Sequence, residues 1–154
     1  MIDATPSGRH RAIREAEVKI EVSGVIARPP EVVFQFIGFE HITNHPRWDT
    51  KMELEQLSPG PLGVGTIVRR RHTRAGYPIE GTMECVEFDP PWAIAFLIHD
   101  GPVEMHGRQS IEPEGENGSK LTISADIPGA PDPLDPMPVE DSVRRITELI
   151  ESER

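Results

Sequence analysis

The stretch TIVRRRHTRAGYPIEGTMEC, residues 66–85, predicts a β-hairpin, and the rest of the fold is interpreted from it. Ala75-Gly76 is a turn signal, and alternating residues typical of strands lie on both sides of it. A two-residue turn at this point sets the register, so residue 70 lies opposite residue 81 and residue 72 opposite residue 79. A longer turn through Tyr77-Pro78 is the alternative, and a shift of one residue would exchange the two faces.

One face of the predicted hairpin is apolar or small on its second strand, where the set is Ile79, Gly81, Met83 and Cys85. Paired residues share a face, so an inward set there also brings Val68, Arg70 and His72 inward. Gly81, opposite Arg70, leaves room for a long side chain. A buried Arg70 then needs a carboxylate, water in an open pocket or an anionic ligand as its partner.

The other cations of the hairpin, Arg69 and Arg71, are expected in solvent.

The rest of the chain predicts further strands and two short helices. Residues 17–27 alternate as a half-buried strand, and further strands are expected within 51–57, 92–99, 103–112 and 119–126. Pro29-Pro30 opens a helix over 30–37 for which Gly38 is a plausible stop. A second short helix over 39–44 is expected to end at Pro46.

The C-terminal part contains a proline-rich connector, residues 128–138, and an amphipathic helix over 139–153. Residues 1–16 are expected to be a flexible tail, and residues 17–154 a single domain. The predicted class is α+β: a curved antiparallel sheet of about seven strands wraps around the C-terminal helix. Two short helices follow the first strand, and the space under the sheet is either filled or a pocket.

Composition limits the partners. The 154 residues carry a formal charge of −10, which argues against nucleic acid, and no apolar run is long enough to span a membrane. The N-terminus has no apolar signal segment. Cys85 is the single cysteine, so no internal disulfide forms, and a buried apolar role is favoured over a nucleophilic one. These features predict a cytoplasmic protein.

Four motifs in order resemble the START/Bet v 1-like (SRPBCC) superfamily, in its polyketide cyclase/dehydrase-like branch. They are VIARPPEVVFQFI at 25–37, HPRWD at 45–49, GPLGVGT at 60–66 and VEFDPPWAIAF at 86–96. The resemblance implies a helix-grip fold whose cavity, between sheet and C-terminal helix, holds apolar or amphipathic molecules. The proline connector and the short final helix depart from the family pattern. No catalytic residue is carried over from the family.

The candidate ligand-binding residues are Trp48, Val68, Arg70, His72, Ile79, Gly81, Met83 and Met105. Arg70 and His72 are also the candidate catalytic residues, because an inward imidazole can move protons at neutral pH. His41 and His45 are four residues apart and would share a helix face, but a third ligand is missing, so no metal site is predicted. No cofactor is expected. His99 is placed at the rim, His106 on the outer face and His10 in the tail.

Three functions remain open. The first is the binding of a lipid-like or polyketide-like molecule in an internal cavity, with Arg70 and His72 orienting its polar end. The second is a cyclase or dehydrase that acts on a bound aromatic or poly-keto substrate. The third is a protein-interaction module without a ligand, and a homodimer is possible.

Overall fold

The computed structural model describes residues 18–74, 76–128 and 136–153. Its elements, in chain order, are β1 (Val18–Ile26), α2 (Pro30–Phe34), the π-helix η1 (Gln35–Phe39), α3 (His41–Trp48), β2 (Glu53–Gln56), β3 (Ile67–Arg74), β4 (Tyr77–Asp89), β5 (Ala93–Asp100), β6 (Val103–Glu114), β7 (Gly118–Ile127) and α4 (Met137–Ser152). The predicted tail and most of the proline connector lie outside the described residues.

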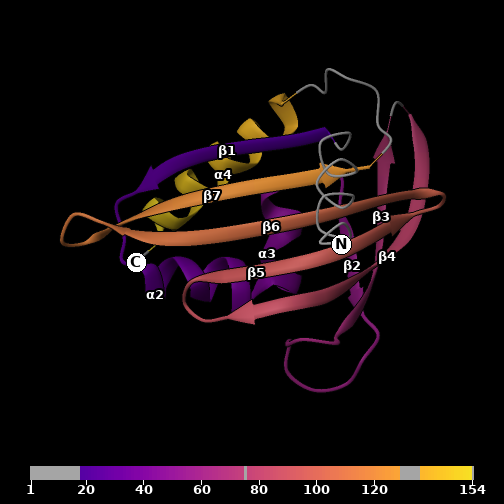
Figure 1. Cartoon of the computed structure of the whole chain (residues 1–154), viewed down its shortest axis with the longest axis horizontal. Helices are drawn as coiled ribbons and strands as arrows, with labels where there is room; N and C mark the ends of the chain where they lie inside the picture. Colours follow the sequence, from indigo (N-terminus) through magenta and orange to yellow (C-terminus); the bar gives the residue numbers. More distant parts are fainter. Residues whose placement is uncertain (1–17, 75, 129–135, 154) are drawn as a thin grey trace, which may run out of the picture.

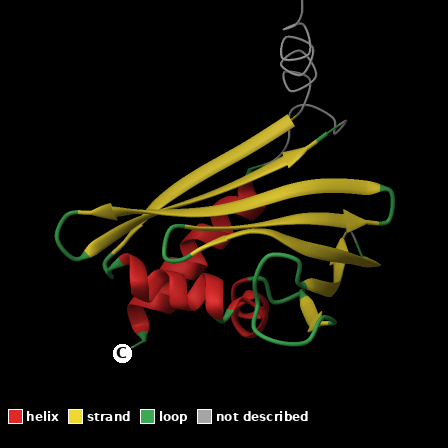
Figure 2. Cartoon of the chain, turned by 60° about the horizontal axis from the view of Figure 1, so that its bottom comes forward, coloured by secondary structure: helices red, strands yellow, loops and turns green. Residues whose placement is uncertain are grey.

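The strands form one antiparallel sheet in the order β1-β7-β6-β5-β4-β3-β2. Figure 1 shows the strongly curved sheet with α4 behind β1 and β7, and Figure 2 shows the helices gathered on one side of it. The predicted helix-grip arrangement is therefore confirmed. None of the described helices is long and apolar enough to cross a membrane.

Apolar side chains from both layers meet between the sheet and the helices. The buried core contains Ile26, Val33, Phe34, Phe36, Ile37, Trp48, Val68, Met83, Cys85, Ile94, Phe96, Ile111, Leu121, Ile123, Val143, Ile146 and Ile150. Strand β1 approaches α4 closely at Gly24, where an added Cβ would lie 2.7 Å from Cγ1 of Val143. The buried residues of α4 recur at helical spacing, as its amphipathic pattern predicts.

Three predicted helix boundaries were wrong. Gly38 does not end a helix: it is buried in η1, where an added Cβ would lie 2.5 Å from the ring of Phe34. Pro46 lies inside α3, and the helix continues because Trp48 is buried against Phe36. Helix α4 begins at Met137 and ends at Ser152, so it starts earlier than the predicted residue 139. In the first two cases, tertiary packing outweighs a local breaker signal.

Candidate functional site

The hairpin of β3 and β4 has the predicted register. Val68 pairs with Met83, Arg70 with Gly81, and His72 with Ile79. Arg70 is only 5% exposed and His72 only 8% exposed, whereas Arg69 and Arg71 are exposed. The inward orientation of Arg70 is therefore confirmed.

The carboxylate of Asp100, at the end of β5, is the partner of both inward basic side chains, Arg70 and His72. Arg70 Nε donates to Asp100 Oδ1 at 3.0 Å, and Arg70 Nη2 donates to Oδ2 at 3.2 Å. His72 Nε2 lies 3.0 Å from the same Oδ2, so this nitrogen carries a proton and donates. The side chains of Arg70 and Asp100 are 6% and 1% exposed. We call Arg70, His72 and Asp100 the charged cluster.

Gly81 makes the charged cluster possible. It pairs with Arg70 on one side and with Asp100 on the other. A Cβ at this position would lie 2.1 Å from the His99 carbonyl oxygen and 2.5 Å from Asp100 Oδ1. The room that was predicted for Arg70 is therefore filled by its carboxylate partner.

The two outward arginines form exposed ion pairs on the opposite face of the hairpin. Arg69 pairs with Glu55, and Arg71 pairs with Glu80 at 2.8 Å and with Glu53 at 3.6 Å. Hydrogen bonding to Glu80 raises the pKa of Arg71. Exposed pairs of this kind contribute little to stability, so only the inward Arg70 and His72 mark a candidate site.

The remaining predicted ligand-binding residues lie at different depths. Trp48 and Met83 are buried, whereas Ile79, Gly81 and Met105 are half-buried. Met83 and Met105 both pair with Ile98 of β5, so all three side chains share the inner face. Whether these residues contact a ligand remains a prediction.

A second group of polar side chains comes from α3. His41 Nδ1 lies 2.7 Å from the Ile37 carbonyl oxygen, and His41 Nε2 lies 3.1 Å from His45 Nδ1. The His45 ring stacks on Trp48 with a centroid distance of 4.9 Å and an interplanar angle of 17°. The His41 ring also contacts Phe96 of β5 at 4.8 Å. We call His41 and His45 the histidine pair.

Both rings of the histidine pair resist protonation. Burial lowers the pKa of His41 to about 4, although its hydrogen bond to the Ile37 carbonyl opposes this effect. The pKa of His45 lies well below its ordinary range because of burial, and then because of His41, Arg70 and His72. The charged cluster and the histidine pair therefore act on each other electrostatically. Among the described residues, no group of three His, Cys, Asp or Glu side chains could hold a metal ion.

Two hollows of about 380 Å³ flank α4. One lies between the end of α4 and helix α2 with η1, and includes Phe36 and Ile150. The other lies between the end of α3 and the start of α4, and includes Trp48 and Arg145. Neither is lined by Arg70 or His72, so the cavity at the charged cluster remains a prediction.

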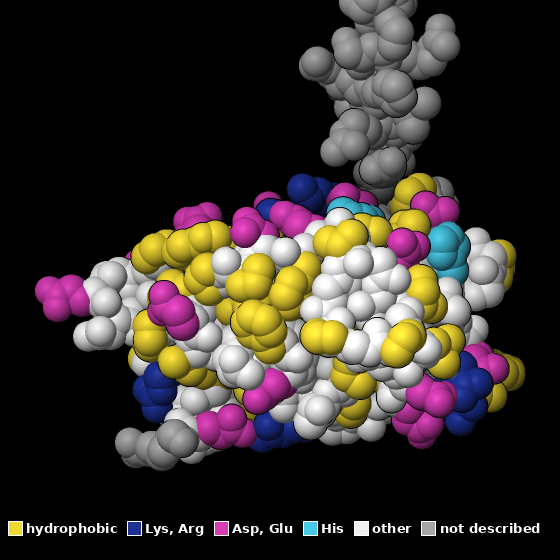
Figure 3. All heavy atoms as spheres, turned by 90° about the horizontal axis from the view of Figure 1, so that it is seen from below, with side chains coloured by type: hydrophobic (Ala, Val, Ile, Leu, Met, Phe, Trp, Pro, Cys, Tyr) yellow, Lys and Arg dark blue, Asp and Glu magenta, His cyan; other side chains and the backbone are white. Residues whose placement is uncertain are grey.

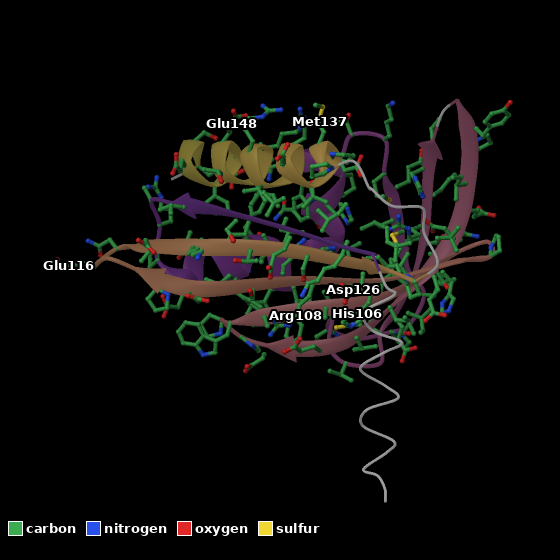
Figure 4. All side chains as sticks on the ribbon, turned by 45° about the horizontal axis from the view of Figure 1, so that its top comes forward. His106, Arg108, Glu116, Asp126, Met137 and Glu148 are labelled. Atoms are coloured by element: carbon green, nitrogen blue, oxygen red, sulfur yellow. The ribbon has the colours of Figure 1, made fainter. Side chains whose placement is uncertain are left out.

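Several large hydrophobic side chains are exposed on the surface of the protein. Figure 3 shows hydrophobic side chains gathered on the face seen from below, and exposed examples in the chain include Val32, Phe39, Val64 and Trp92. Figure 4 shows His106 and Arg108 on β6, and Arg108 donates to Glu87 at 2.7 Å. His106 pairs with Asp126 of β7, across the sheet face that was predicted to be outward. The homodimer and the interaction module remain untested predictions.

Sequence reasoning missed Asp100 and the contact within the histidine pair. Asp100 is not among the predicted site residues; it lies directly before Gly101 and after His99, which was placed at the rim and is exposed. The His-x3-His spacing predicts a shared helix face, but it does not predict the bond between the two rings. Cys85 is fully buried, and burial raises the pKa of its thiol, in agreement with the apolar role.

Comparison with known structures gives the same fold. Zhui aromatase/cyclase from Streptomyces sp. R1128 is 17% identical, with a TM-score of 0.71 over 88% of this chain and 94% of that chain. Truncated norcoclaurine synthase from Thalictrum flavum is 16% identical, with a TM-score of 0.71 over 90% and 98%. Ginseng major latex-like protein 151 from Panax ginseng is 17% identical, with a TM-score of 0.69 over 89% and 97%.

No curated protein sequence matches the chain. A family model described as "Polyketide cyclase / dehydrase and lipid transport" matches residues 17–150, which is most of the chain. The chain therefore belongs to the polyketide cyclase/dehydrase and lipid transport family, within the Bet v 1-like (SRPBCC) superfamily.

Proposed function

We propose that the protein binds an apolar or amphipathic small molecule between the concave face of the sheet and the helices. The polar end of the molecule lies at the charged cluster, and its apolar body lies against the inner face of β3 to β6. The contacting residues of this proposal are Trp48, Val68, Arg70, His72, Ile79, Gly81, Met83 and Met105, with Asp100 added from the structure.

The observation that carries this proposal is the burial of the charged cluster in a mostly apolar interior. A buried ion pair is often no more stabilising than apolar side chains of similar size, because both charges lose their hydration. Its presence beside the apolar row of Val68, Met83 and Ile98 therefore suggests a role besides stability. Convergent polar groups at the end of an apolar surface are typical of small-molecule sites.

The apolar part of the site can supply the affinity. Burial of about 300 Å² of apolar ligand surface contributes about 7 kcal/mol before the entropy cost of association. Methionine side chains adapt to ligands of different shape, and Met83 and Met105 lie on the inner face. The charged cluster then fixes the orientation of the ligand and adds to its affinity.

A second candidate function is a cyclase- or dehydrase-type reaction on the bound molecule. The observation that favours it is the contact between Asp100 Oδ2 and His72 Nε2, because a carboxylate that holds an imidazole fixes its orientation for proton transfer. In this candidate, His72 Nδ1 takes a proton from a keto substrate and Arg70 stabilises the enolate. The family description and the Streptomyces aromatase/cyclase support this reading at the level of the family.

Native mass spectrometry of the freshly purified protein tests for a retained small molecule. A titration with 1-naphthol then compares Arg70→Gln with Arg69→Gln, which removes the same charge from the neighbouring exposed position. The proposal expects weaker binding or a changed ligand orientation only in Arg70→Gln, with thermal unfolding followed to confirm that both variants fold. If folded wild-type protein retains no molecule and binds no apolar probe, the proposal is wrong.

A further inference from the structure

The hydrogen bonds of the histidine pair determine which ring nitrogens carry protons. His41 Nδ1 lies 2.7 Å from the Ile37 carbonyl oxygen, which can only accept, so Nδ1 carries the proton. In a neutral ring, His41 Nε2 is then an acceptor. His45 Nδ1, at 3.1 Å from it, must therefore donate. A neutral His45 is left with an unprotonated Nε2.

Both rings are neutral at neutral pH. The pKa of His41 is lowered to about 4, and that of His45 lies well below 6.5. A proton added to His45 would lie near Arg70 and His72 of β3, which both disfavour it, and would lose hydration. The tautomer chain that starts at the Ile37 carbonyl therefore persists at neutral pH.

The His45 ring is held near the charged cluster. Helix α3 packs against β2, and Leu54 of β2 pairs with Arg70 of β3. Stacking on the buried Trp48 fixes the plane of the His45 ring. Within the described part of the chain, His45 Nε2 has no hydrogen-bond partner, although Nδ1 has one.

We propose that His45 binds the polar end of the ligand through Nε2 as a hydrogen-bond acceptor. The ligand group at this end is therefore a donor, such as a phenolic or enolic hydroxyl, and not a carboxylate. This inference rests on the proposed function and names the ligand chemistry of the same site. His41 acts as a positioning residue, because it fixes the tautomer of His45 without contact with the ligand.

The charge balance of the interior supports a neutral donor. The guanidinium of Arg70 already donates to both oxygens of Asp100, so an incoming carboxylate would compete with an existing internal partner. It would also bring negative charge towards Asp100 and towards the lone pair of His45 Nε2. A hydroxyl neither competes with Asp100 for Arg70 nor adds negative charge, since it donates one proton and is neutral.

The test compares three probes of one ring system: 1-naphthol, 1-methoxynaphthalene and 1-naphthoate. We expect wild-type protein to bind 1-naphthol about fivefold more tightly than the methyl ether, as one neutral hydrogen bond allows. His45→Asn keeps a group near His41 but removes the acceptor at the Nε2 position, so the preference should disappear. His45→Gln places an amide oxygen near that position and should retain it. His99→Asn, at an exposed position, is the matched control.

A second measurement reads the proton position directly. Nitrogen-15 chemical shifts of the imidazole ring should show a protonated Nδ1 and an unprotonated Nε2 on His45 in the ligand-free protein. A proton on Nε2, an unchanged naphthol preference in His45→Asn, or tighter binding of 1-naphthoate would each overturn the inference while the proposed function stands. If none of the three probes binds folded protein, the proposed function fails, and the inference that rests on it fails too.

Discussion

Asp100→Asn removes the charge of the shared carboxylate with almost no change of shape. Arg70 Nε lies 3.0 Å from Asp100 Oδ1, and the two side chains are 6% and 1% exposed. At that separation and an effective dielectric constant of about 20, the attraction is about 5 kcal/mol. The variant loses most of it and leaves a guanidinium buried without a counter-charge.

The expected loss is about 3–5 kcal/mol in the free energy of unfolding, which is the usual cost of removing one partner of a buried pair. The lower end applies if the new amide oxygen still accepts one hydrogen bond from Arg70. Such a loss is a large part of the about 5–15 kcal/mol by which a domain of this size is stable. Adding Arg70→Met to Asp100→Asn removes the unpaired cation, so the double variant should recover at least about 1 kcal/mol.

Urea unfolding followed by tryptophan fluorescence and by far-ultraviolet circular dichroism measures these differences. Glu80→Gln is the matched control, because it removes a carboxylate from an exposed arginine pair on the other face of the same hairpin. It should unfold at nearly the wild-type urea concentration. A loss in Asp100→Asn as small as that of the control would refute the view that the charged cluster is dry and energetically coupled.

Three further predictions concern packing and pH. Gly38→Ala should destabilise the fold by about 1–3 kcal/mol in urea unfolding, because the new methyl group meets the fully buried Phe34 ring. An unchanged midpoint would contradict the overlap. Gly81→Ala should lower the free energy of unfolding more than Gly38→Ala does, because its new methyl group meets a backbone carbonyl oxygen. Equal losses in the two alanine variants would contradict this ranking. The unfolded chain protonates His41 below pH 6.5 while the folded chain does so only near a pKa of about 4, so His41 alone should lower the stability by about 2 kcal/mol between pH 7 and 5. His45, whose pKa is also lowered, adds to the same slope. His41→Gln should make that slope less steep in urea titrations without abolishing it, and an equally steep slope would show that His41 does not contribute.

Much of the candidate site could be predicted because the hairpin carries its own register. Ala75-Gly76 sets the pairing of β3 with β4, and the alternation of β4 shows which face is buried. Together they place Arg70 inward. The sequence also predicts that Arg70 has a partner, because a buried charge without one is energetically costly.

The partner itself could not be predicted, because a β-bulge changes the register of the next pair. Asp89 pairs with Ala93, and counting back from that turn would place Gly81 opposite Gly101. A shift between Cys85 and Glu87 instead places Gly81 opposite Asp100. The sequence of β5 does not show which of its side chains face inward, because AIAFLIHD is apolar on both faces for most of its length.

The helical errors have a similar origin. Gly38 and Pro46 are ordinary helix-ending signals, but aromatic packing from Phe34 and Trp48 decides the backbone there. The same packing stacks the His45 ring on Trp48, and that contact depends on α3 continuing past Pro46. Spacing alone could indicate a shared face, but not that the two rings bond to each other.

Methyl NMR of methionine-labelled protein tests the central claim most directly. Met83 and Met105 lie on the inner face, whereas Met137 is 58% exposed at the start of α4 and serves as an internal control. We predict that 1-naphthol shifts the Met83 and Met105 signals and gives intermolecular contacts to them, with Met137 unchanged. Contacts to Met137 alone, or no shift at either inner methionine when the probe is bound, would show that the interior does not hold the ligand.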